Sequence, residues 1–188
     1  MIMKRSMIFL TAIALILTLA LSMTACGSNG GSETTAPATD AAATEAAPAG
    51  AGISVDDTTF TYNNVSVALD GSIDEVIAGL GEAKDVKSEL SCHGEGDDKT
   101  FTYDGFIVKS YPKDGADRVL EVLINDAGIP TSKGIEVGSK LEDVIAAYGD
   151  VYTTIAGKRY VYDAGNGKTL RFVIEDNAVV QIDYYFNV

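Results

Sequence analysis

The stretch "GSIDEVIAGLG" (Gly71–Gly81) has a close counterpart in "GSKLEDVIAAYG" (Gly138–Gly149), which contains one additional residue. Each stretch opens with Gly-Ser, and each serine, Ser72 or Ser139, precedes a glutamate by three positions, the spacing of a helix capping box. Apolar residues then recur at helical spacing, and the final glycine suits the left-handed end of a helix. The pair therefore predicts two short amphipathic helices, each with a serine–glutamate cap.

The repeat continues downstream as strand patterns separated by turn residues such as Asp-Gly. The matching segments are Lys99–Gly105 with Lys158–Gly165, Phe106–Tyr111 with Thr169–Ile174, and Arg118–Ile124 with Ala178–Phe186. We therefore predict an α+β fold in which two helix-plus-three-strand repeats form an antiparallel sheet with the helices packed on one face. Repeat one covers about residues 58–127, with a preceding strand around Thr59–Leu69, and repeat two covers about residues 128–188.

The last predicted strand alternates between two faces. The side chains expected to point toward the core are Val180, Ile182, Tyr184 and Phe186, and those expected to point the other way are Gln181, Asp183 and Tyr185. An antiparallel sheet with helices on one face leaves its opposite face open, and we expect that face to bind a partner. The candidate contact residues, turned toward this face or its rim, are Lys109, Tyr111, Arg171 and Tyr185.

Residues 1–25 have the layout of a secretory signal peptide. Lys4 and Arg5 precede an uncharged apolar run over Met7–Met23, and small residues precede Cys26. The segment resembles a bacterial lipoprotein signal, and the resemblance implies cleavage before Cys26 and acylation of its thiol. Chains such as palmitate would then anchor a lipoprotein at the extracytoplasmic face of the cell membrane. The alternative is an uncleaved signal anchor, because about 17 apolar residues can just span a bilayer. Both alternatives place the remainder outside the cytoplasm.

Residues 26–52 comprise the expected lipidated cysteine, Cys26, and a tether rich in Ala, Gly, Thr and Pro. We predict that the tether is disordered, because it contains no large apolar side chain to bury. Residues 53–188 are long enough for one domain with its own core. The chain has a formal net charge of −13, nearly all of it on this domain. Such an acidic surface repels phosphate backbones, which argues against nucleic acid as the partner. We expect membrane attachment through the N-terminal lipid and a protein or cell-envelope partner.

The Gly-Ser, capped-helix and terminal-glycine motif, present twice within residues 65–188, resembles the fold shared by β-lactamase inhibitor protein and the small outer-membrane lipoproteins of the SmpA/OmlA type. The resemblance implies helix-plus-hairpin units that grip other proteins. Glu82 and Asp150 stand where that group often has proline, and the inhibitor's contact loops have no match, so no binding residue carries over. The chain is also similar to small, acidic, tethered lipoproteins of anaerobic Gram-positive bacteria.

His93 is the single histidine of the chain and follows Cys92 directly. If Cys26 is acylated, Cys92 has no partner for an intrachain disulfide, and we expect it to be buried or half-buried. Adjacent strand residues point to opposite faces, which disfavours a catalytic pair. We predict a binding module with no catalytic residue, metal or cofactor. The alternatives are a structural spacer or complex subunit, and a small metal-binding or catalytic domain centred on this pair and the nearby acids Glu95, Asp97 and Asp98.

Overall fold

The computed structural model describes residues 52–188. The predicted signal peptide, the lipidation site Cys26 and nearly all of the tether lie outside the described residues. No helix within residues 52–188 has the length and apolar character needed to cross a membrane.

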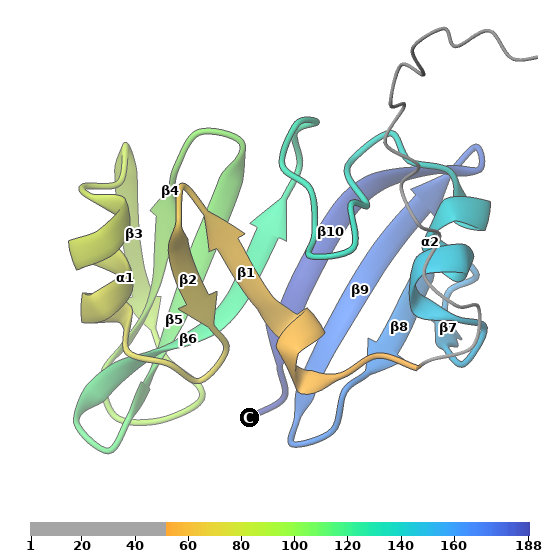
Figure 1. Cartoon of the computed structure of the whole chain (residues 1–188). Helices are drawn as coiled ribbons and strands as arrows, with labels where there is room; N and C mark the ends of the chain where they lie inside the picture. The colour runs from red at the N-terminus through yellow and green to blue at the C-terminus, as the bar shows by residue number, and fades with distance from the viewer. Residues whose placement is uncertain (1–51) are drawn as a thin grey trace, which may run out of the picture. The chain divides into compact units, whose positions relative to one another are not determined.

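Eight antiparallel strands form one sheet in the order β3-β4-β5-β6-β10-β9-β8-β7 (Figure 1). The strands are β3 (Asp85–Leu90), β4 (Asp97–Thr102), β5 (Phe106–Lys113), β6 (Ala116–Ile124), β7 (Thr153–Ile155), β8 (Arg159–Asp163), β9 (Lys168–Glu175) and β10 (Ala178–Phe186). Each repeat forms a four-stranded meander, and the last strands of the two meanders pair at the centre, where Ile182 lies opposite Ile124. The sheet is therefore built from two related halves with β6 and β10 as their junction.

The expected fold class, α+β with helices packed on one face, is wrong. Among residues 52–188 the structure is mostly antiparallel β, with 47% of residues in strands and 15% helical. The two α-helices, α1 (Ile73–Leu80) and α2 (Leu141–Tyr148), have eight residues each. Between them, the hairpin of β1 (Thr59–Tyr62) and β2 (Val65–Ala68) lies in front of the middle of the sheet, preceded by the 3-10 helix η1 (Val55–Thr58) (Figure 1). The single strand expected around Thr59–Leu69 is therefore a two-stranded hairpin that forms a sheet of its own.

Each repeat contains four strands rather than the three that were predicted. The strands that the prediction lacks are β3 and β7. Every residue of both strands is exposed, and β7 is only three residues long. The two strands form the outer edges of the sheet, so neither has a buried side and neither shows the alternation of apolar and polar residues that identifies a strand.

Aromatic side chains join the hairpin and the sheet in one core. Phe60 of β1 is fully buried and its ring centroid lies 5.0 Å from that of Phe106 and 5.8 Å from that of Tyr184. At the α2 end, the Tyr148 ring lies 5.4 Å from Phe172. Such tilted aromatic pairs add to the free energy of burying their surface.

The helix ends show how the two repeats align. Gly81 and Gly149 have φ values of 82° and 85°, and each N–H donates to the carbonyl four residues earlier, which ends the helix as the sequence predicted. The N-terminal caps differ from expectation. Ser72 makes no side-chain cap, and the second helix is preceded by Lys140, whose N–H donates to Asp143 Oδ2 at 3.1 Å. The additional residue of repeat two therefore lies before the helix, which moves Ser139 out of the cap position.

The predicted position of Val180 is also wrong. The register between β10 and β9 shifts between Val179 and Gln181, so Val180 bulges out of the ladder and is 39% exposed, while Val179 is 1% exposed. A bulge adds one residue to a strand and breaks the simple two-residue alternation. Ile182 and Tyr184, beyond the bulge, are buried in the core as predicted.

Candidate functional site

The β1–β2 hairpin and η1 lie in front of the middle of one face of the sheet, with α1 and α2 at its two ends, and no element within residues 52–188 covers the other face (Figure 1). Register identifies this open face: Arg171 lies opposite both Asp183 and Val161, while the neighbouring Phe172 points into the core. Side chains such as Val161 are half-exposed there, whereas Phe172 is fully buried. The open face therefore presents a mixed apolar and charged surface.

Arg171 and Tyr185 form the centre of the open face. The guanidinium carbon of Arg171 lies 3.6 Å from the centroid of the Tyr185 ring, close enough for a cation–π interaction. Its Nε donates to Thr169 Oγ1 at 3.1 Å, and its Nη1 lies 3.5 Å from Asp183 Oδ2. The Arg171 side chain is 13% exposed, so these contacts hold a planar cation in one orientation at the surface.

Asp183 is a nearly buried carboxyl on this same face, with a side chain only 1% exposed. Burial, followed by the negative charge of Glu121, raises the pKa of Asp183 to about 7, while Arg171 and Arg159 act in the opposite direction. Its Oδ1 has no hydrogen-bond partner among residues 52–188. The carboxyl is therefore poised between its neutral and charged forms near neutral pH.

A groove of about 380 Å³ runs beside this cluster and is lined by residues that include Lys109, Glu121 and Tyr185. Lys109 Nζ lies 2.6 Å from Glu121 Oε2, and the Glu121 side chain is only 12% exposed. Three of the four predicted contact residues, Lys109, Arg171 and Tyr185, thus lie together on the open face.

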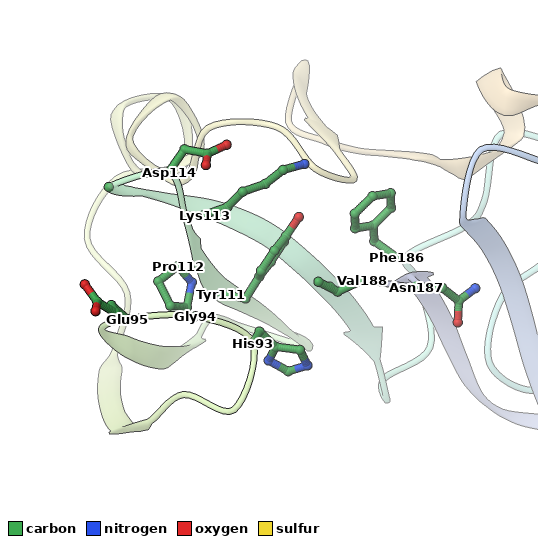
Figure 2. Close-up of a pocket in the computed structure, with 11 residues that line it drawn as sticks. His93, Gly94, Glu95, Tyr111, Pro112, Lys113, Asp114, Phe186, Asn187 and Val188 are labelled. Carbon is green, nitrogen blue, oxygen red and sulfur yellow. The ribbon is translucent and has the colours of Figure 1, made fainter.

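Tyr111, the fourth predicted contact residue, does not lie with the other three on the open face. Its ring is 1% exposed and its hydroxyl donates to Asp70 Oδ1 at 2.6 Å, while Lys113 pairs with the same carboxylate. Partial burial acts to raise the pKa of Asp70, but the hydrogen bonds that it accepts from Tyr111 and Lys113 outweigh this effect and lower its pKa. Burial, together with the hydrogen bond to Asp70, raises the pKa of Tyr111. Tyr111 lines a second cavity, of about 520 Å³, in which Figure 2 places its ring among His93, Lys113 and Phe186.

Cys92 and His93 lie in the turn between β3 and β4, and Cys92 is exposed rather than buried. Because the two residues are in a turn and not in a strand, their side chains point toward each other: Cys92 Sγ lies 3.9 Å from His93 Nδ1. Asp98 Oδ2 lies 3.2 Å from the same nitrogen. Of the three nearby acids considered from the sequence, Asp98 is the one that joins this cluster.

Sequence reasoning missed Glu121 and Asp183 as members of the site. The signal was present, since each is the single carboxylate within an otherwise apolar or aromatic strand segment, "VLEVLI" or "IDYYF". Which of them would be buried depends on the pairing of β6 with β10, and this contact between distant segments is not visible in local patterns.

No protein-family model and no curated protein sequence matches the chain. An extracellular protein containing an SCP domain from Bacillus anthracis str. Ames is 11% identical with a TM-score of 0.46, over 63% of this chain and 44% of that one. The chain thus spans less than half the length of that protein. A DUF4309 family protein (YjgB) from Bacillus subtilis subsp. subtilis str. 168 is 15% identical with a TM-score of 0.45, over 71% of this chain and 90% of that one. Similarities this weak assign neither fold nor function.

Proposed function

We propose that this protein is a lipid-anchored, extracytoplasmic binding module that recognises a protein or cell-envelope component through the open face of its sheet. The observation that carries the proposal is the cluster of Arg171, Asp183 and Glu121, which keeps charged groups nearly buried on a face that no described element covers. Burying charges in this way seldom stabilises a fold as well as apolar packing does. Preorganised charged groups at a surface do provide specific recognition.

The chemistry of the face indicates the kind of partner. Arg171, held flat against Tyr185, offers donors suited to a carboxylate or a carbonyl, and the ion pair of the half-exposed Lys109 with the nearly buried Glu121 adds one charge of each sign. A partner with paired polar groups, such as a folded protein or an envelope polymer, fits this surface. The formal charge of −13 argues against nucleic acid and anionic lipid headgroups.

The N-terminal sequence supports the anchoring part of the proposal, since its positive start, apolar run and Cys26 have the layout of a lipoprotein signal. Acylation is tested by growing cells with labelled palmitate. The parent chain should incorporate label and Cys26→Ser should not. Incorporation that persists in Cys26→Ser would contradict acylation at this cysteine.

The open face is tested with a photoreactive residue on intact cells. It replaces Val161, which lies opposite Arg171 on the open face, and in a matched control it replaces Lys140, an exposed residue before α2 on the covered side. We expect a defined cross-linked species from position 161 and its loss when Arg171→Ala and Tyr185→Ala are added. A species that survives the double substitution, or one formed from position 140 alone, would overturn the proposed surface.

A further inference from the structure

Three side chains at the turn between β3 and β4 converge on one point. The Cys92 sulfur, a His93 ring nitrogen and an Asp98 carboxylate oxygen all lie within 4.8 Å of one another. We propose that Cys92, His93 and Asp98 form a binding site for a divalent transition metal ion, with zinc as the ion that fits best. This site uses none of the residues that carry the open-face proposal above.

The contacts distinguish a metal site from a catalytic triad. In a Cys–His–Asp triad the thiol and the carboxylate contact opposite nitrogens of the imidazole, so that a proton can pass through the ring. Here Cys92 Sγ and Asp98 Oδ2 both approach Nδ1 of His93, at 3.9 Å and 3.2 Å. A relay through the ring is therefore not available, whereas convergence of three donor atoms is what a single cation requires.

The spacing of the donors suits tetrahedral zinc. Bonds of about 2.0–2.3 Å at tetrahedral angles separate neighbouring donor atoms by about 3.3–3.7 Å. The separations of His93 Nδ1 from Cys92 Sγ and from Asp98 Oδ2, 3.9 Å and 3.2 Å, lie close to that range, and the third pair of donor atoms lies within 4.8 Å. A thiolate, an imidazole and a carboxylate form a donor set that favours zinc and similar ions over calcium, which takes six to eight oxygen ligands.

Ser91 holds two of the three ligands in place. Its hydroxyl donates to Asp98 Oδ1 at 2.6 Å and accepts the backbone N–H of His93 at 2.9 Å. This leaves Asp98 Oδ2 as the oxygen nearest the imidazole. Hydrogen bonds of this kind orient metal ligands before the ion arrives and raise affinity.

The position of the cluster provides access to the ion. His93 and Asp98 have side chains 25% and 28% exposed, and Cys92 is exposed. His93 lines the 520 Å³ cavity beside Tyr111, and Asp98 lines the groove on the open face. Three protein ligands leave one tetrahedral position for water or for a donor from another molecule.

The test uses the whole chain in detergent with Cys26→Ser, so that Cys92 is the single thiol, after treatment with a chelator. Titration with Co²⁺ should give a thiolate-to-cobalt charge-transfer band at one ion per chain, and calorimetry with Zn²⁺ should give the same stoichiometry. Cys92→Ser and Asp98→Asn should each weaken zinc binding by at least about 10-fold, since each removes a ligand and loss of an outer-shell partner alone typically costs that much. Glu95→Gln, in the same turn but outside the cluster, is the matched control and should bind as the parent does.

A second measurement needs no variant of the ligands. Zinc, but not calcium, should slow alkylation of Cys92 by iodoacetamide in the Cys26→Ser chain, because a bound thiolate is not free to react. Failure of that chain to bind either Zn²⁺ or Co²⁺, or equal zinc binding by Cys92→Ser, would overturn the site. Neither result would affect the open-face proposal, which rests on other residues.

Discussion

The turn between the first two strands of each meander differs in length between the two halves of the sheet. In repeat two, β7 passes to β8 through three residues, Ala156–Lys158, in which Ala156 and Gly157 have φ values of 53° and 68°. In repeat one, β3 passes to β4 through six residues, Ser91–Gly96, which include the cysteine and the histidine. A compact turn is sufficient to connect these strands, so the additional length in repeat one is not a requirement of the fold. The metal-ligand cluster occurs in the longer turn.

The comparison of the two halves is meaningful only if both are stabilised by one common core. The substitutions with the largest expected effect on the free energy of unfolding test this. Phe106 of β5 and Phe172 of β9 occupy corresponding strands and are 2% and 0% exposed. Phe106→Ala and Phe172→Ala should each lower the free energy of unfolding by about 3–5 kcal/mol, because each removes a ring and leaves a cavity. Denaturant unfolding measures both. A loss confined to one half would show that the halves do not form one cooperative core.

A second difference between the halves lies just before the helices. Asp70 in repeat one and Gly138 in repeat two donate their N–H groups to Val119 and Val179 at 2.8 Å, but only Asp70 offers a carboxylate, which Tyr111 contacts. Tyr111→Phe should lower the free energy of unfolding by about 1.5–3 kcal/mol, since it removes a partly buried hydrogen bond to a charged group.

The expected pH dependence of this pair has a defined sign. The pKa of Asp70 is lowered in the folded state, so its contribution is present above its unfolded pKa and is lost as the pH falls below about 4. The difference between the parent and Tyr111→Phe should therefore shrink in acid. Tyr160→Phe, at a half-exposed tyrosine of β8, is the control and should change the free energy of unfolding by less than about 0.5 kcal/mol.

Asp183 gives the opposite pH dependence. Its folded pKa is raised to about 7 by burial and by Glu121, with Arg171 and Arg159 opposing, so ionising it as the pH rises from about 4 to 7 lowers the stability of the folded state. Relative to the parent, Asp183→Asn should gain about 2–3 kcal/mol in free energy of unfolding between pH 5 and pH 8, because over that range the buried carboxyl of the parent ionises. Thermal unfolding at both pH values measures this. Asp163→Asn, at an exposed carboxylate of β8, controls for the loss of one negative charge, and an equal gain there would contradict the argument.

The sequence correctly predicted features that repeats and local periodicity determine. Its predictions failed for features that depend on pairing between strands distant in the sequence. The glycine-ended helices and the buried Ile182 and Tyr184 followed from spacing alone. The fold class was wrong because β3 and β7 have no buried side, and Val180 was misplaced because a bulge depends on the partner strand. The Cys92 cluster was kept only as an alternative, because two neighbours in a turn were treated as residues of a strand.

The smallest expected change in stability comes from exchanging the turns. Replacing Ser91–Gly96 with the Ala-Gly-Lys of repeat two halves the number of residues in the connection. The shorter loop lowers the entropic cost of loop closure by about 0.6 kcal/mol, which favours folding. The exchange also removes the contact between the His93 and Tyr111 rings, which are 5.9 Å apart, so we expect a net change within about 1 kcal/mol. Zinc binding should nevertheless be lost, because two of its three ligands are removed. A chain that unfolds on this exchange would show that the long turn serves the fold, and the contrast between the halves would then carry no information about function.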